Sequence, residues 1–281
     1  MSIIVHANAK INLSLDITGI RNDGYHLLYS VMQSVDLYDK ITVLRSDKIE
    51  VMSFIRGEIN TAYKAAYEFF KYTEINGGAK IFVKKNIPLK SGLGGGSADA
   101  AAVITALDIL YKTNLTDSER CEIAIKIGAD VPFCIIGGTV LVEGIGEKTT
   151  KLPDISDVYF VIVKRGKKPS TREMYGRYDL QKNIIHPESE KIIEAINNQN
   201  ILKNAQILKN VFEILWEEKI ADIKACMNKN GSKASLITGS GPSVFGIFTN
   251  ENAAKACADE LKIIAKHVYI CKNAKSGVEI I

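Results

Sequence analysis

A cluster of four glycines within five positions constrains the fold of this chain more than any other feature. Residues 88–102 read Pro-Leu-Lys-Ser-Gly-Leu-Gly-Gly-Gly-Ser-Ala-Asp-Ala-Ala-Ala. Glycine permits positive φ and close approach of the backbone to a ligand, and alanine favours helix, so we expect a loop that leads through Ser97 into a helix over residues 98–112. The N–H groups and positive dipole at a helix N-terminus bind phosphate. The segment therefore predicts a site for a nucleotide or another polyphosphate.

Two familiar glycine motifs do not fit this loop. A Walker A loop needs Gly-Lys-Ser/Thr, whereas Gly96 is followed by Ser97 and Ala98. The dinucleotide-binding fingerprint needs its third glycine where Ser97 stands, and the acidic residue expected about twenty positions later is not in a following strand. A plain glycine-rich turn before a helix remains the alternative to a ligand loop.

The composition predicts an ordinary globular protein of one large or two smaller domains. The chain has 281 residues, and its 46% hydrophobic and 24% charged content is typical of such proteins. The net charge of +4 is small and the lysines are scattered, so nothing in the composition indicates nucleic-acid or membrane binding. No apolar run is long enough to span a membrane, and the N-terminus lacks the features of a signal peptide.

The cysteines predict a reducing compartment. Their number, five, is odd, they lie far apart in the sequence, and no Cys-x-x-Cys pair occurs. This pattern argues against a disulfide framework or a zinc site. We therefore expect a cytoplasmic protein.

Alternation of apolar and polar residues predicts a half-buried first strand over Ile3–Gly19, with Lys10 and Asn12 on its polar face. Further strands are expected at 27–35, 40–44, 49–54, 79–84, 139–143, 159–164, 234–238, 244–249 and 268–271. Helices are expected at 61–71, 98–112, 117–127, after the Ser170–Glu173 capping pattern, and at 188–197, 202–216, 220–228 and 252–265. This order favours an α+β sandwich, with a domain boundary in the link 151–157.

Four separated motifs together resemble the GHMP kinase superfamily over nearly the whole chain. They are residues 10–13 with Gly-Tyr-His at 24–26, the glycine loop, Gly-Ala-Asp-Val-Pro-Phe at 128–133, and Thr-Gly-Ser-Gly-Pro-Ser-Val-Phe-Gly at 238–246. The resemblance implies the GHMP kinase fold. Its N-terminal α/β domain, like one found in a ribosomal protein, would span 1–155 and its ferredoxin-like α+β C-terminal domain 156–281. The active site would lie in the cleft between the two domains.

Within the superfamily, the resemblance implies ATP-dependent phosphorylation of a hydroxyl on a methylerythritol linked to cytidine diphosphate. It implies that Lys10 and Asp130 are catalytic. Phosphoryl transfer needs a positioned nucleophile and neutralised phosphate charge, so Asp130 would accept the hydroxyl proton while Lys10 keeps that carboxylate ionised. The alternatives are a helix-capping carboxylate for Asp130 and a solvated strand lysine for Lys10.

The resemblance also implies where ATP, accompanied by Mg²⁺, would bind. The residues carried over to ATP binding are Asn60, Lys85, Leu89, Lys90, Ser91, Gly92, Leu93, Gly94, Gly95, Gly96, Ser97, Ala98 and Asp99. Asn60 and Lys85 would lie near the adenine, although both could be ordinary surface residues. No carboxylate identifies itself as a ligand of the metal, and a site made mostly of phosphate and water oxygens would suit magnesium.

The substrate site is carried over in the same way. Its residues are Asn12, Tyr25, His26, Thr171, Tyr175, Gly239, Ser240 and Gly241. Tyr25 and Tyr175 would stack on the two faces of the cytosine while His26 reads its edge. Tyr175 could equally be a packed helix residue, and the basic cluster 164–168 could meet the diphosphate or be a solvated loop.

Three other functions compete with this prediction. The nearest is a GHMP kinase of the homoserine or mevalonate type. A non-catalytic nucleotide-sensing regulator is a second, and the presence of both Lys10 and Asp130 argues against it. An RNA-binding module is a third, but the chain lacks a basic face studded with aromatics. We expect a monomer or weak homodimer whose partner is a small molecule, with no nucleic acid and no membrane.

Overall fold

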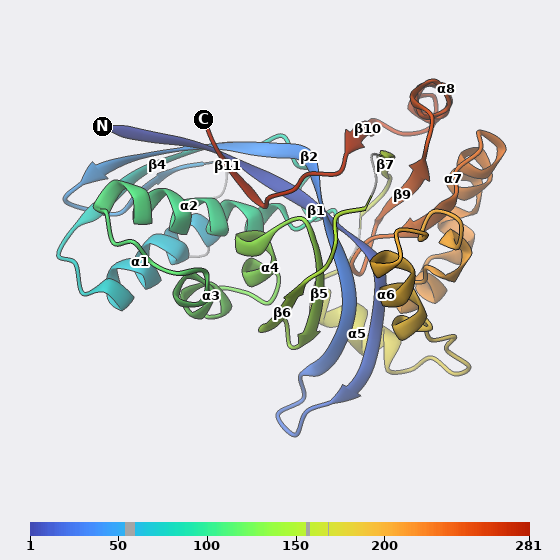
Figure 1. Ribbon diagram of the computed structural model, residues 1–281, viewed down its shortest axis with the longest axis horizontal. Helices are drawn as coiled ribbons and strands as arrows, with labels where there is room; N and C mark the ends of the chain where they lie inside the picture. The colour runs from blue at the N-terminus through green and yellow to red at the C-terminus, as the bar shows by residue number, and fades with distance from the viewer. Residues whose placement is uncertain (54–59, 156–157, 168) are drawn as a thin grey trace.

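The computed structural model describes residues 1–53, 60–155, 158–167 and 169–281. Two β-sheets lie side by side, each with helices packed against it (Figure 1). The long strands β1 (Ser2–Ile20) and β2 (His26–Ser46) run through the middle of the molecule and reach from one half to the other (Figure 1).

The first sheet is built around the antiparallel β1–β2 pair. Its main order is β11-β1-β2-β4-β3, and β5 pairs with the N-terminal half of β2 and with β6. The other strands of this sheet are β3 (Glu50–Met52), β4 (Gly78–Lys84), β5 (Thr139–Gly144), β6 (Lys148–Lys151) and β11 (Val278–Ile280). Its helices are α1 (Thr61–Thr73), α2 (Gly95–Tyr111), α3 (Asp117–Ile125) and α4 (Val131–Ile136).

The second sheet has the order β10-β7-β9-β8 and is antiparallel throughout. Its strands are β7 (Tyr159–Lys164), β8 (Ala234–Ile237), β9 (Ser243–Phe248) and β10 (His267–Lys272). Helices α5 (Thr171–Tyr178), α7 (Glu217–Lys229) and α8 (Glu251–Lys262) belong to this half, whereas α6 (Ser189–Asn197) packs its buried residues into the larger core with the first sheet. Two short 3₁₀ helices precede α7, at Ala205–Ile207 and Val211–Leu215.

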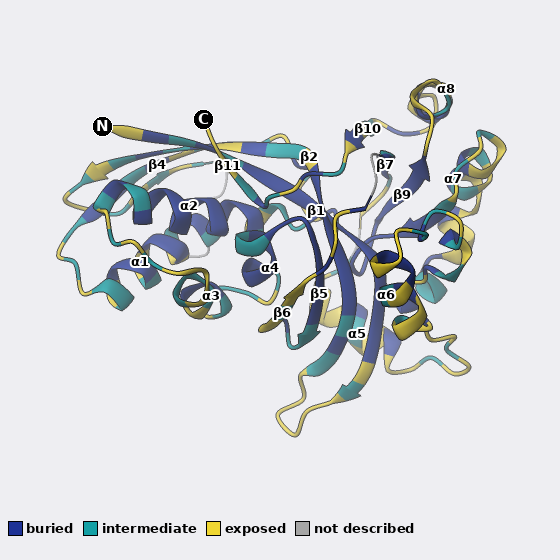
Figure 2. Cartoon of the chain, in the orientation of Figure 1, coloured by how far each residue is buried: buried dark blue, intermediate teal, exposed yellow. Residues whose placement is uncertain are grey.

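Strand β1 connects the two hydrophobic cores. Ile11 and Leu13 pack into the larger core, whereas Leu15 and Ile17 pack into the smaller one with helices α5, α7 and α8. Most of β1 is buried along its length (Figure 2). The polar residues of β1 are therefore held between the two halves of the molecule.

The prediction of a half-buried first strand is wrong, because both faces of β1 are covered. Lys10 is only 3% exposed and Asn12 is fully buried. The backbone of the glycine loop lies against this face, since the amide of Lys10 donates to the carbonyl of Leu93 at 3.0 Å. The polar face of β1 that carries Lys10 and Asn12 is therefore a buried interface and not a solvent-exposed face.

The predicted helix over 202–216 is also wrong, because the chain there forms the two short 3₁₀ helices. Asn210 explains the interruption. Its side chain accepts from the amide of Phe212 at 3.0 Å and donates to the carbonyls of Ile237 and Gly239, both at 2.9 Å. An asparagine that bonds to the backbone in this way competes with helix formation.

Other boundaries differ from the predicted ones. The strands predicted at 27–35 and 40–44 are one continuous strand, β2, and helix α2 begins at Gly95 rather than at residue 98. Sequence periodicity did not identify α4, β6 or β11, which are six residues long or shorter. The predicted strand 49–54 is seen as β3, and residue 54 lies outside the described residues.

Two further predictions concern the division of the chain and membranes. Residues 156–157 of the predicted inter-domain link lie outside the described residues, and the boundary at 155/156 stays a prediction. Within the described ranges, no helix is long and apolar enough to cross a membrane.

Candidate active site

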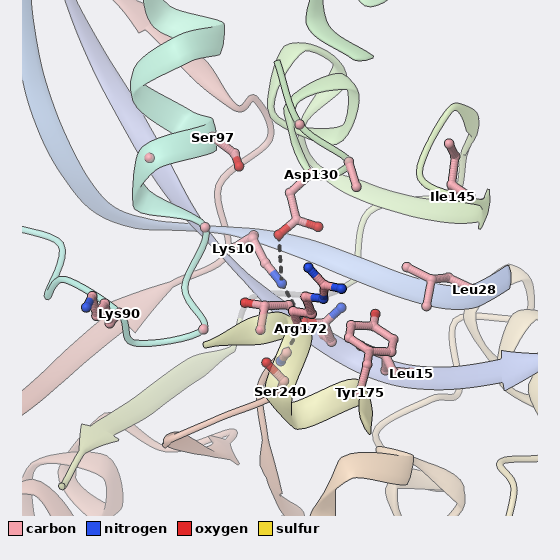
Figure 3. A pocket seen from close by; sticks show the side chains of 18 of the residues that line it. Lys10, Leu15, Leu28, Lys90, Ser97, Asp130, Ile145, Arg172, Tyr175 and Ser240 are labelled. Atoms are coloured by element: carbon pink, nitrogen blue, oxygen red, sulfur yellow. Dashed lines mark hydrogen bonds and ion pairs between the residues drawn. The ribbon is translucent and has the colours of Figure 1, made fainter. Parts of the chain in front are cut away.

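One pocket of about 1200 Å³ collects most of the predicted site residues (Figure 3). The predicted residues that line it are Lys10, Asn12, Tyr25, His26, Lys85, Leu89, Lys90, Ser91, Gly92, Gly94, Gly95, Gly96, Ser97, Asp130, Thr171, Tyr175, Gly239 and Ser240. Asn60, Leu93, Ala98, Asp99 and Gly241 are buried behind it. Pockets for a single small ligand measure roughly 300–1000 Å³, so the volume of this one lies above that range.

The glycine loop turns sharply into helix α2. Gly92 and Gly94 have φ of 84° and 71°, a backbone region that residues with a side chain rarely adopt. Gly94 is the N-cap of α2, and the first turn of that helix contains no acidic residue. The N–H groups of this turn, which have no partner within the helix, are therefore available to an anion in the pocket.

Lys10 and Asp130 lie together on the wall of the pocket (Figure 3). Nζ of Lys10 is 3.4 Å from Oδ2 of Asp130 and donates to Oδ1 of Asn12 at 2.8 Å. Lys10 is buried, whereas the side chain of Asp130 is 30% exposed. Although Asp130 occupies the N-cap position of α4, its carboxylate makes no capping hydrogen bond. The carboxylate is thus directed to the lysine and the pocket.

Asn12 holds Lys10 against the turn at 238–241. Oδ1 of Asn12 accepts from Nζ of Lys10, from the amide of Gly239 at 2.8 Å and from the hydroxyl of Thr238 at 3.2 Å. The backbone amide of Asn12 donates to Oγ1 of Thr238 at 3.1 Å. The glycine loop also meets the start of β9 directly, because the amide of Ser243 donates to the carbonyl of Ser91 at 3.2 Å. This network fixes the position of the lysine ammonium.

A second lysine, Lys85, lines the pocket beside the first turn of α2. Its Nζ contacts Oδ2 of Asp39 and lies 2.7 Å from Oδ2 of Asp99. Burial alone would lower the pKa of Lys85, but the carboxylates of Asp99 and Asp39 outweigh it and raise that pKa. Burial raises the pKa of Asp99 to about 8 against the opposing effect of Lys85. Asp99 therefore serves Lys85 rather than the pocket directly.

Asn60, the other residue expected near adenine, caps helix α1. Its Oδ1 accepts from the amide of Ala62 at 2.8 Å, and the residue is 6% exposed. Asn60 lies behind the pocket, whose wall at this point includes the next residue, Thr61.

Another part of the pocket is lined by the rings of His26, Tyr175 and Phe212. The rings of His26 and Tyr175 have centroids 4.6 Å apart, and Tyr175 also packs edge-on against Phe212 at 4.9 Å. Burial raises the pKa of the Tyr175 hydroxyl. Tyr25 is 61% exposed in the turn between β1 and β2, where its ring lies 5.8 Å from the guanidinium carbon of Arg21. Only one of the two predicted stacking rings is thus held in place by packing.

Sequence reasoning missed several charged residues of the pocket. Arg172, Asp179, Asp23 and Lys126 line it, and Arg172 extends from α5 into the cavity (Figure 3). The one signal for Arg172 was its place directly after the Ser170-Thr171 start of α5. In the basic cluster 164–168, Arg165 pairs with Asp222. Residues 164–167 do not line the pocket, and residue 168 lies outside the described residues.

Metal-binding side chains do not gather in this site. Over residues 1–53, 60–155, 158–167 and 169–281, no group of three or more histidine, cysteine, aspartate or glutamate side chains could hold a metal ion.

The chain matches two family descriptions and several curated proteins. "GHMP kinases N terminal domain" matches residues 60–138 and "GHMP kinases C terminal" matches residues 192–266. The 4-diphosphocytidyl-2-C-methyl-D-erythritol kinase of Clostridium tetani is 43% identical over 277 residues, which are 96% of this chain and 99% of that protein. The enzyme of the same name from Clostridium botulinum is 41% identical over 275 residues, covering 95% and 98%.

Solved structures agree with these matches. A 4-(cytidine 5'-diphospho)-2C-methyl-D-erythritol kinase superposes with a TM-score of 0.79 at 27% identity, covering 98% of this chain and 99% of that one. A homoserine kinase from Cytophaga hutchinsonii reaches the same TM-score at 22% identity, covering 100% and 97%, and at that identity it shows the fold alone. This chain matches both the N-terminal and the C-terminal family descriptions and aligns over nearly its whole length with relatives at 41–43% identity. It therefore belongs to the GHMP kinases, within the group of the 4-diphosphocytidyl-2-C-methyl-D-erythritol kinases, and is an ATP-dependent small-molecule kinase.

Proposed function

We propose that this kinase transfers the γ-phosphate of ATP to the 2-hydroxyl of 4-diphosphocytidyl-2-C-methyl-D-erythritol, a step of the non-mevalonate route to isoprenoid precursors. One observation carries the assignment to this site. A single pocket is lined by the glycine loop, by the Lys10–Asp130 pair and by the rings of His26 and Tyr175. A phosphate site and an aromatic site in one cavity suit a nucleotide donor and an acceptor that carries a base.

In this proposal Asp130 is the general base and Lys10 positions it. A carboxylate that is partly exposed to the pocket can accept the proton of the attacking hydroxyl. The buried ammonium of Lys10, 3.4 Å away, favours the ionised carboxylate. The N–H groups at the start of α2 would hold the phosphates of ATP and oppose the charge that develops as phosphate is transferred. A non-catalytic regulator would have no need of this pair.

We propose that Mg²⁺ accompanies ATP, as its chemistry requires. The described residues provide no cage of carboxylates, which suits a metal held mainly by phosphate and water oxygens. The hydroxyl of Ser97 and the carboxylate of Asp130 both line the pocket and are among the protein oxygens that could complete the coordination of the ion. When bound, the ion would neutralise charge on the phosphates.

We also propose a cytoplasmic enzyme that is a monomer or weak homodimer, with two domains divided near residue 155. The support for the compartment is that all five cysteines are free thiols. Three of them, Cys134, Cys257 and Cys271, are buried, so they behave as core residues.

The experiment that tests the function is a substrate panel. The protein is incubated with ATP, Mg²⁺ and the cytidyl substrate, and ³¹P NMR and mass spectrometry follow ADP and the phosphorylated product. Homoserine and mevalonate are offered in parallel, and ADP release without acceptor gives the background. We expect product from the cytidyl substrate alone. Turnover of homoserine or mevalonate without turnover of the cytidyl substrate would contradict the proposal.

A further inference from the structure

Two histidine–aspartate pairs join the β1–β2 hairpin to the segment that begins at the end of α5. Nε2 of His26 lies 2.7 Å from Oδ1 of Asp179, and Nδ1 of His186 lies 2.6 Å from Oδ1 of Asp16. Only the first pair lines the pocket. Its partners are 153 residues apart in the sequence, so the contact belongs to the folded site and not to local structure.

The surroundings of His26 fix its ring from two directions. Tyr175 contacts the ring with an interplanar angle of 42°, and Asp179 binds it at the Nε2 edge. Both partners belong to the same turn of α5, because the amide of Asp179 donates to the carbonyl of Tyr175 at 3.0 Å. Phe212 packs against the other side of that turn through Tyr175. The side chain of His26 is consequently only 13% exposed.

We infer that Asp179 is a positioning residue, which sets the tautomer of His26 and thereby the preference of the site for cytosine over uracil. The inference rests on the proposed function. An ionised carboxylate can only accept a hydrogen bond, so a neutral His26 must carry its proton on Nε2. Its Nδ1 is then a hydrogen-bond acceptor. Within the part of the chain that the structure describes, no hydrogen bond occupies Nδ1.

An acceptor at Nδ1 discriminates between the two pyrimidines. Cytosine carries a 4-amino donor at the position where uracil carries a carbonyl oxygen. Nδ1 can receive a hydrogen bond from the amino group, whereas the uracil oxygen would face a second acceptor and leave both groups unpaired. Sites that pair with a donor reject an analogue that lacks it, because the buried partner is left without a hydrogen bond. Without Asp179, His26 could move its proton to Nδ1 and accept uracil.

The test compares Asp179→Ala with two matched variants. Asp179→Glu keeps a carboxylate that can reach Nε2. His186→Ala removes the other histidine–aspartate pair, which ties the same part of the chain to the hairpin but lies outside the pocket. For each protein, kcat and KM are measured with the cytidyl substrate and with its uridyl analogue. Nitrogen-15 NMR of the histidine rings, assigned with His26→Gln, reports which nitrogen carries the proton.

We expect Asp179→Ala to reduce the preference for the cytidyl substrate by about tenfold, the effect of one hydrogen bond. The change should appear in KM, with kcat for the cytidyl substrate within about twofold of wild type. Asp179→Glu should retain the preference, and so should His186→Ala. In the spectra, the Nε2 proton of His26 should be present in the wild type and shared between both nitrogens in Asp179→Ala.

Two results would overturn the inference. One is an unchanged preference in Asp179→Ala while the wild type turns over the cytidyl substrate. The other is an equal loss for both substrates, matched by His186→Ala, which would make Asp179 a structural tie. If the wild type does not phosphorylate the cytidyl substrate at all, the proposed function fails and the inference fails with it.

Discussion

Substituting Gly92 by alanine tests whether the glycine loop must touch the turn at 238–241. A Cβ at Gly92 would lie 2.4 Å from the carbonyl oxygen of Thr238 and 3.0 Å from that of Gly241. Ordinary contacts begin at 3.4 Å, so the turn would have to retreat by about 1 Å. Gly92 also has a φ of 84°, which strains any residue with a side chain.

The expected loss of stability has two parts. The strain at positive φ costs about 1–2 kcal/mol. The retreat of the turn would break the hydrogen bonds from Thr238 and Gly239 to Asn12, at about 1 kcal/mol each. Gly231→Ala is the matched control, because its φ is 85° and a Cβ there meets nothing within 4 Å. Only the first part applies to that variant.

The difference between the two variants is therefore about 2 kcal/mol, which for a protein of this size lowers the melting temperature by roughly 4 °C. Thermal melting followed by circular dichroism measures it. Because Asn12 also holds Lys10, we expect kcat of Gly92→Ala to fall by about tenfold, as Lys10 loses its fixed position. Gly231→Ala should keep kcat within about twofold. Equal melting temperatures and equal kcat values for the two variants would refute the reasoning.

Three further predictions address the proposed chemistry. Asp130→Asn should lower kcat by about 10²–10⁴-fold with ATP affinity retained, and adding Lys10→Met should lower kcat little further because the two residues act together. ADP release measures kcat and calorimetry measures ATP affinity. Near-normal turnover of Asp130→Asn would show that Asp130 is not the base. Tyr25→Ala should raise KM for the cytidyl substrate by about 10–100-fold, and Tyr25→Phe should raise it much less because the aromatic face is kept. KM for ATP is the control. Equal increases in KM for both substrates would mean that Tyr25 supports the fold and does not stack on the cytosine. The raised pKa of Asp99, about 8, means that the folded protein holds a proton that the unfolded chain releases. The contribution of Asp99 to stability should therefore fall as pH rises from about 4 to 8, so the melting temperature of Asp99→Asn minus that of wild type should be greater at pH 8 than at pH 5. A difference independent of pH would contradict the burial of that carboxylate.

Motifs in the sequence identified the residues that converge, although not their surroundings. Lys10, the glycine loop and Asp130 could be found because each needs a particular residue type at a fixed place: an ammonium, a backbone without Cβ and a carboxylate. The pocket brings the three together.

The features that could not be predicted from the sequence depend on contacts between distant segments of the chain. Alternation in β1 correctly predicted a strand, but it could not show that the polar face would be covered by the loop at 91–94. Residues 202–216 have a helical pattern, yet Asn210 bonds to a strand end 27 and 29 residues away. Asp179 follows an unremarkable helix, and its partner His26 lies 153 residues earlier. No local pattern carries this information.

The hydrogen bond from Gly239 to Asn12 has a consequence for the order of folding. It closes a loop of 227 residues, so it forms only after the second sheet has assembled and docked against β1. A nascent chain that ends before residue 238 would have the glycine sequence and Lys10 without the amide and hydroxyl that fix Asn12. During refolding, secondary structure and burial of Trp216 should thus precede the return of kinase activity, which would report the docking of the turn at 238–241 against Asn12.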